Sequence, residues 1–109
     1  MAYDEKLAQK IRQVLADQQG LVEKKMFGGV GYMIRGNMAC GVNKDKLIVR
    51  VGPQGHETAM ARPHTLPFDI TGTAMTGWVM VAPEGCMDDT DLRAWVQEGI
   101  DFSLTLLAK

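Results

Sequence analysis

The sequence has 109 residues, of which 46% are hydrophobic and 23% carry a charge. A chain of this length encloses one modest core, so we expect a single domain over residues 1–109. A formal net charge of -1 gives no global field that would draw the chain to nucleic acid or to an anionic membrane. No apolar run approaches the roughly 20 residues of a membrane-spanning helix, and no signal peptide is evident. We therefore expect a soluble, cytoplasmic protein.

The first predicted element is an amphipathic helix over residues 4–18. Its apolar side chains recur at intervals of three and four and form one stripe: Leu7, Ala8, Ile11, Val14 and Leu15. Gly20 follows, where a residue free to adopt positive φ ends the helix and lets the chain reverse.

Residues 22–51 show short apolar runs separated by glycine or Asx turns, a pattern that predicts an antiparallel meander. The predicted strands cover residues 22–27, 30–35, 38–42 and 46–51. Turns are expected at Gly28-Gly29, at Gly36-Asn37 and at 43–45. In the fourth strand, alternation places Leu47, Val49 and Val51 on one face and Lys46, Ile48 and Arg50 on the other.

The second half of the chain begins with a helical turn or two within residues 55–62, which Pro63 and Pro67 end. Two more short strands are predicted over residues 68–72 and 77–82. Asp88 or Asp89 is expected to cap a long terminal helix whose apolar face runs from Leu92 to Leu107. Gly99 on that face indicates close backbone approach to the sheet or to the first helix.

The order helix, meander, helix predicts the α+β class. The expected architecture is a single-domain layer sandwich in which the N- and C-terminal helices flank an antiparallel meander sheet.

The glycine-rich stretch is not expected to bind phosphate. The run from Gly29 and Gly31 ends in Ile34, where a dinucleotide fingerprint needs its third glycine. It also opens a strand, so no helix N-terminus follows to receive an anion. We predict a structural turn and no cofactor.

Four residues form the only cluster suited to metal binding or proton transfer: His56, Glu57, His64 and Asp69. Their spacing matches no familiar site, and solvated loop histidines are the favoured interpretation, so no metal site is assigned.

The possible nucleophiles lack an evident base. Ser103 falls in the terminal helix, and Cys40 and Cys86 match no zinc or C-x-x-C spacing. Cys86 precedes a helix, where a lowered pKa is a weak redox hint. No catalytic residue is assigned and we expect no enzyme activity.

The predicted sheet carries apolar groups on both faces. One face is expected to pack against the helices. The other face carries Ile48, Trp78 and Met80. It is a candidate face for a protein partner or for self-association, unless the 52–67 connection shields it. A basic patch for nucleic acid is a less favoured alternative to a solvated charged rim. Its candidate residues are Lys24, Lys25, Arg35, Lys44, Lys46 and Arg50.

One sequence pattern is similar to a known family. It consists of Lys25-Met26-Phe27-Gly28-Gly29-Val30-Gly31, then Gly36-Asn37-Met38, the strand 47–50, Pro67-Phe68, and Asp88-Asp89 leading into Leu92 and Trp95. Over essentially the whole chain it resembles the N-terminal domain of the TfoX/Sxy family of competence regulators.

The resemblance implies an α+β domain with an antiparallel sheet and no known catalytic residues, acting in transcriptional regulation. The resemblance also suggests that the motif residues form a structural turn with its packing, or a contact. These residues are Lys25, Met26, Phe27, Gly28, Gly29 and Gly31. We expect a regulatory module that binds protein. The alternatives are a direct DNA-binding regulator and a metal- or small-molecule-dependent enzyme.

Overall fold

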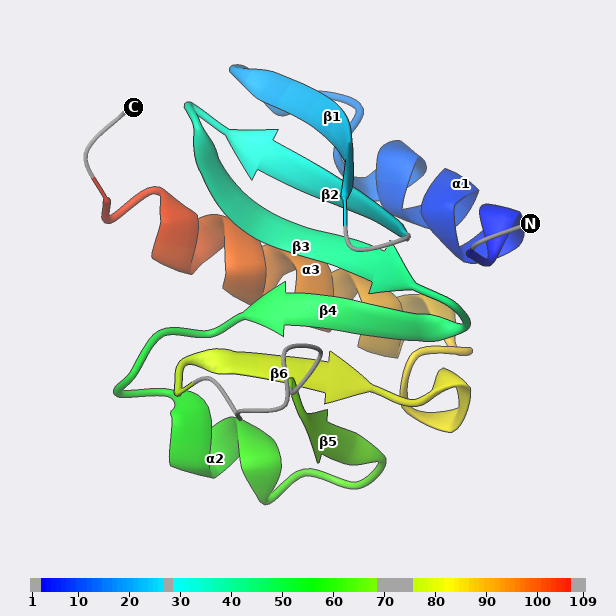
Figure 1. The fold of residues 1–109 in the computed structure, drawn as a ribbon, viewed down its shortest axis with the longest axis vertical. Helices are drawn as coiled ribbons and strands as arrows, with labels where there is room; N and C mark the ends of the chain where they lie inside the picture. The colour runs from blue at the N-terminus through cyan, green and yellow to red at the C-terminus, as the bar shows by residue number, and fades with distance from the viewer. Residues whose placement is uncertain (1–2, 27–28, 69–75, 107–109) are drawn as a thin grey trace.

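The computed structural model describes residues 3–26, 29–68 and 76–106. These residues form a six-stranded antiparallel sheet in the order β1-β2-β3-β4-β6-β5, with helices before, within and after it (Figure 1). The strands are β1 (Leu21–Met26), β2 (Gly29–Ile34), β3 (Asn37–Asn43), β4 (Lys46–Arg50), β5 (Thr65–Pro67) and β6 (Trp78–Val81). The helices are α1 (Glu5–Val14), α2 (His56–Met60) and α3 (Asp89–Ser103), with a 3-10 turn, η1, at Pro83–Gly85. The predicted α+β class is confirmed.

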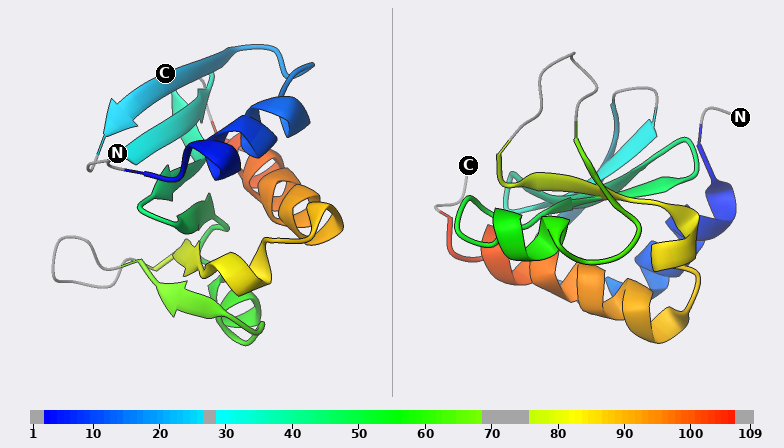
Figure 2. Two further views of the ribbon diagram at one scale, coloured as in Figure 1. Left: turned by 90° about the vertical axis from the view of Figure 1, so that its right-hand side faces the viewer. Right: turned by 90° about the horizontal axis from the view of Figure 1, so that it is seen from below.

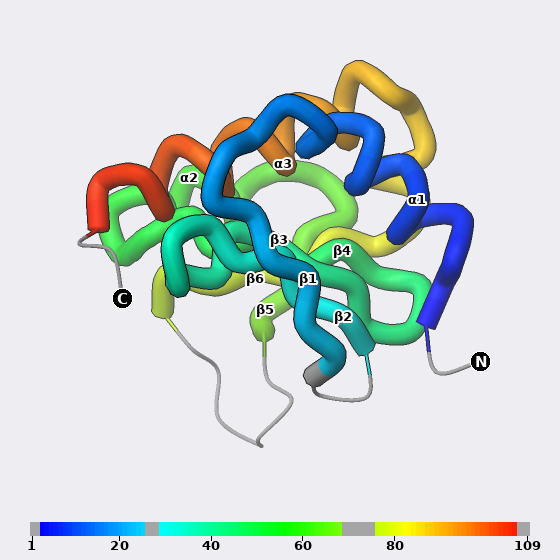
Figure 3. The backbone as a smooth tube through the Cα atoms, turned by 90° about the horizontal axis from the view of Figure 1, so that it is seen from above, coloured from blue at the N-terminus to red at the C-terminus, as the bar shows by residue number. Residues whose placement is uncertain are grey.

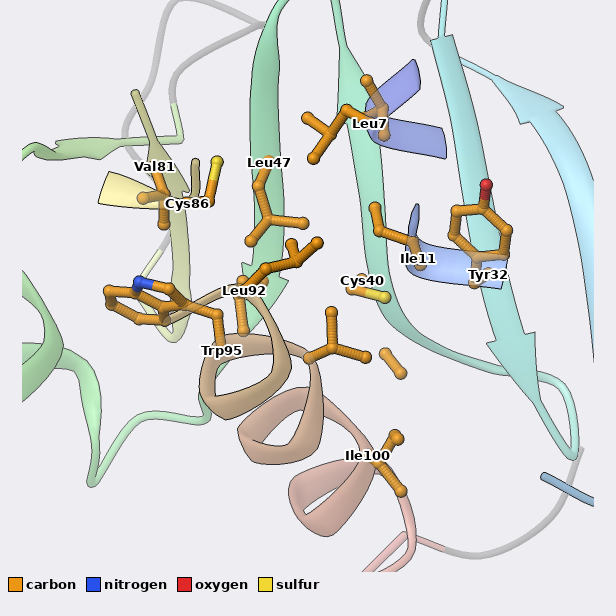
Figure 4. Close-up of a cluster of buried hydrophobic side chains, with 14 of the residues drawn as sticks. Leu7, Ile11, Tyr32, Cys40, Leu47, Val81, Cys86, Leu92, Trp95 and Ile100 are labelled. Atoms are coloured by element: carbon orange, nitrogen blue, oxygen red, sulfur yellow. The ribbon is translucent and has the colours of Figure 1, made fainter. Parts of the chain in front are cut away.

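Helices α1 and α3 pack side by side on one face of the sheet (Figure 2). Their apolar stripes meet the inward side chains of the strands in one buried cluster (Figure 4). Its members include Leu7, Ile11, Tyr32, Leu47, Val81, Leu92, Trp95 and Ile100. The alternation predicted for β4 is confirmed, because Leu47, Val49 and Val51 all join this cluster.

Helix α1 is fixed at its start and along one side. Asp4 Oδ1 accepts hydrogen bonds from the backbone N–H of Lys6 at 2.9 Å and of Leu7 at 3.2 Å, which caps the helix. The Tyr32 hydroxyl donates to the Ala8 carbonyl at 3.1 Å, and burial raises the pKa of Tyr32. The helix ends at Val14, earlier than the predicted 18, and turns lead to Gly20 with φ +74°.

A two-pronged ion pair joins α1 to β1. Arg12 Nε and Nη2 each donate to one Glu23 carboxylate oxygen at 2.8 Å. These hydrogen bonds lower the pKa of Glu23, because they favour its charged form.

Two predicted hairpin turns differ from the structure. The loop between β2 and β3 is Arg35-Gly36, with φ +51° and +84°, and Asn37 already belongs to β3. Gly29 is the first residue of β2 and not a turn residue, and Gly28 lies outside the described residues. Glycine is needed at position 29 for another reason, since a Cβ there would collide with the Val42 carbonyl of β3.

One strand predicted in the second half of the chain can be compared with the structure only at its first residue. The strand predicted over 68–72 is wrong at Phe68, because β5 ends one residue earlier; residues 69–72 fall outside the described part. β5 contains Pro67, and proline is tolerated there because β5 is an edge strand. The helical turn predicted within 55–62 is confirmed as α2.

Helix α3 begins and packs as predicted. Asp88 Oδ1 accepts from the Thr90 N–H at 2.7 Å and caps the helix. Gly99 lies against β3, where a Cβ would collide with the Ala39 carbonyl oxygen, so the predicted close approach to the sheet is confirmed. The helix ends at Ser103, before the predicted Leu107, which lies outside the described residues.

Arg62 fastens the segment between β4 and β6 to α3. Its guanidinium carbon lies 3.5 Å from the centroid of the Trp95 ring, and Nη1 is 2.7 Å from Glu98 Oε2. The predicted 52–67 connection is thus tied to the helix layer at this point. It does not cross the opposite face of the sheet there.

Candidate functional site

The sheet face that points away from α1 and α3 carries a second apolar cluster. Its buried members are Met38, Ile48, Phe68 and Met80, and Met33 and Trp78 pack against them. The strand register explains the grouping, because Ile48 pairs with Met80 and Arg50 with Trp78 across β4 and β6. The three residues predicted as a partner face, Ile48, Trp78 and Met80, are therefore brought together.

Two of these three residues are shielded from solvent, an outcome that the sequence left open. Ile48 is 1% exposed and Met80 is 9% exposed, while Trp78 is half-buried. Phe68, itself 3% exposed, stacks on Trp78 with 5.7 Å between ring centroids. The sequence placed Phe68 in the family pattern and in a predicted strand, but not in this cluster. No periodicity shows that a single aromatic residue next to a connection packs on a sheet face.

Two exposed apolar residues lie at the two ends of this face: Leu66 of β5, which pairs with Met80 and is 39% exposed, and Val22 of β1, which is 54% exposed. Val22 is the more exposed of the two. Val22 pairs directly with the half-buried Met33, and Lys24 pairs with Gly31, which has no side chain. We call Val22, Lys24 and Met33 the β1–β2 strip. It adjoins the sheet edge formed by β1, which Figure 3 shows nearest the viewer.

The family-motif residues fall around the same hairpin. Lys25 and Met26 end β1, Gly29 and Gly31 lie in β2, and residues 27–28 lie outside the described part of the chain. Gly31 faces Gly41 of β3, where a Cβ would come within 2.5 Å of the Val30 carbonyl oxygen. The glycines of this region therefore serve close contact between strand backbones.

The predicted basic residues do not gather into one patch. Strand alternation sends Lys24 and Lys25 to opposite faces of β1. Lys46 and Arg50 occupy opposite ends of β4, and Lys44 lies in the turn before it.

Three of these cations also contact neighbouring groups. Lys46 Nζ lies 3.1 Å from Asp45, and Arg35 Nη2 donates to the Leu104 carbonyl at 3.4 Å. The Arg50 guanidinium carbon lies 5.0 Å from the centroid of the Trp78 ring and 5.4 Å from that of Phe102. Stacking of this kind holds Arg50 against the end of the sheet.

The candidate metal ligands are dispersed. His56 begins α2, and its Nδ1 accepts the Gly77 N–H at 3.0 Å. His64 is exposed with φ +64°, and Asp69 lies outside the described residues. Within residues 3–26, 29–68 and 76–106, no three His, Cys, Asp or Glu side chains are grouped to hold a metal ion.

Both cysteines are buried, free thiols. Burial raises the pKa of Cys40 to about 12 and that of Cys86 to about 11. The lowered pKa predicted for Cys86 is therefore wrong: its position before a helix counts less than its removal from water. Its Sγ donates to the Ala82 carbonyl at 3.6 Å.

We expect both thiols to resist alkylation in the native protein. A thiol with pKa near 11 is almost wholly neutral at pH 8, so labelling should be about a hundredfold slower than in the unfolded chain. Mass spectrometry after timed iodoacetamide treatment, with and without denaturant, measures the ratio. Rapid modification of native Cys86 would contradict the burial of its thiol.

None of the helices in the described ranges is long and apolar enough to cross a membrane. Comparison with curated proteins and with solved structures returned no significant match. Comparison with protein families gave a match to the family described as the TfoX N-terminal domain, over residues 13–103. That match extends from the last turn of α1 to the end of α3 and contains the motif around the β1–β2 hairpin. The chain belongs to the TfoX N-terminal domain family.

Proposed function

We propose that this protein is a small cytoplasmic regulatory module that acts by binding a protein partner, and not by catalysis, in the transcriptional regulation of competence-type genes. Membership of the TfoX N-terminal domain family supports a regulatory role. The observation that carries the binding role is the β1–β2 strip. There an exposed apolar residue lies beside a sheet edge, on the face that the helices leave uncovered.

The chemistry of the strip suits a protein contact. A partner would bury the exposed apolar surface of Val22, and removal of that surface from water favours association. The thioether of Met33 is flexible and adapts to different contact shapes. Lys24 adds one cation on the same face, which favours a partner that places a carboxylate beside an apolar side chain.

Direct DNA binding has less support. Neutralisation of several phosphates requires cations that gather on one surface. Here the basic side chains point to both faces of the sheet and to both ends of β4.

The test compares partner recovery from the native host by tagged wild-type protein and by the Val22→Glu variant. We expect the variant to recover at least tenfold less of any specific partner, because a carboxylate would replace the apolar contact. Met87→Glu is the matched control, since Met87 is 67% exposed and lies outside the strip. Circular dichroism would verify that both variants fold. Equal recovery by wild type and Val22→Glu would remove the strip as the binding surface.

A further inference from the structure

Strand β1 is an outer strand of the sheet, and no strand within the described residues pairs with its other side. In antiparallel pairs, successive residues alternately direct their backbone groups toward and away from the neighbouring strand. The Arg35 N–H donates to the Gly20 carbonyl at 3.0 Å, so residue 20 faces β2. The register is unbroken from Leu21 to Met26. The backbone groups of Leu21, Glu23 and Lys25 therefore point outward from the edge.

The side chains of these outward residues carry complementary charges. Glu23 and Lys25 lie on the same face of β1, two residues apart, and both are exposed. Glu23 holds Arg12, whereas Lys25 forms no ion pair within the part of the chain that the structure describes. A second strand of the same sequence, running antiparallel, can thus supply the carboxylate that Lys25 lacks.

We propose that two copies of this chain associate edge to edge through β1, with Glu23 of each copy opposite Lys25 of the other. A two-fold axis then passes between the two Lys24 residues, and the two sheets become continuous. The two β1–β2 strips come side by side on the same face. This inference goes beyond the proposed partner binding, since it concerns the backbone edge and not the surface of the strip.

The two neighbouring registers also match outward residues with outward residues, but their side chains fit less well. One places Glu23 opposite Glu23 and the other places Lys25 opposite Lys25, each a like-charge pair at the axis. The next register places Val22 opposite Val22 and leaves Leu21 opposite Glu23. The proposed register is the one with two opposite-charge pairs, against a single repulsive pair at Lys24. Lysines on an edge strand oppose pairing, so we expect a weak and reversible dimer.

Disulfide trapping tests the register directly. Directly opposed residues of a non-hydrogen-bonded pair lie about 4.5 Å apart at Cα, within the range of a disulfide. We expect purified Lys24→Cys to form a disulfide dimer in more than half of its molecules under mild oxidation. Val22→Cys is the matched control, since it lies on the same face two residues away and should remain mostly uncrosslinked. The native thiols are buried and should not react.

Charge exchange tests the proposed pairs independently. In sedimentation equilibrium, Lys25→Glu should weaken the wild-type dimer at least tenfold, and the double variant Glu23→Lys with Lys25→Glu should restore it. Three results would overturn the inference: preferential crosslinking of Val22→Cys, equal crosslinking of both variants, or a wild-type monomer at millimolar concentration. A monomer that still loses its partner on Val22→Glu would reject self-association alone and leave the proposed function standing.

Discussion

Replacement of Gly99 with alanine is expected to lower the free energy of unfolding by about 1–3 kcal/mol, although alanine is the better helix former. Gly99 is buried in α3, and a Cβ at this position would collide with the Ala39 carbonyl oxygen of β3. β3 is held between β2 and β4, so its backbone has little room to move aside. The helix must then shift away from the sheet, which loosens the main cluster.

Urea denaturation followed by circular dichroism measures this loss. The matched control is Ala94→Gly at an exposed position of the same helix, where propensity alone should cost about 1 kcal/mol. Gly99→Ala and Ala94→Gly are opposite substitutions in the same helix, and both should lower the free energy of unfolding. An unchanged or raised free energy of unfolding for Gly99→Ala would show that α3 does not approach β3 this closely.

Local patterns predict those parts of the fold that depend on local rules. Gly99 could be placed near the sheet because it falls on the apolar stripe of a periodic helix. The faces of Leu47 and Ile48 follow from alternation within a single strand. Asp88 could be expected as the cap because its carboxylate precedes a helical pattern.

The errors concern features that depend on distant parts of the chain. β5 has only three residues and one of them is Pro67, so its strand character comes from its pairing with β6 and not from its own sequence. Gly29 looked like a turn residue, yet its requirement for glycine comes from β3. The lowered pKa predicted for Cys86 was based on its position before a helix alone, whereas burial has the larger effect on this pKa and raises it.

In the candidate site too, some features follow from local sequence patterns and others depend on distant parts of the chain. Ile48, Trp78 and Met80 could be assigned to one face from alternation, and the register brings them together. Their exposure depends on Phe68, which approaches from another segment. The position of Val22 on an outer strand depends on the strand order, because the later strands add beside β4 and no strand within the described residues pairs with the outer side of β1. A sequence pattern contains neither of these facts.

Replacement of Phe68 with alanine should cost about 3–5 kcal/mol, the range for loss of a buried aromatic side chain. Phe68 is 3% exposed and packs in the second cluster with Ile48, Trp78 and Met80. The neighbouring Leu66→Ala is the matched control and should cost under about 1 kcal/mol, because Leu66 is exposed.

The same variant tests whether Phe68 closes the second cluster. Without the Phe68 ring, Trp78 should become more accessible to acrylamide quenching, whereas Trp95, buried beneath Arg62, should not. The newly exposed apolar surface should bind a hydrophobic dye and promote association. If Phe68→Ala instead leaves stability and quenching unchanged, then Phe68 does not close this cluster.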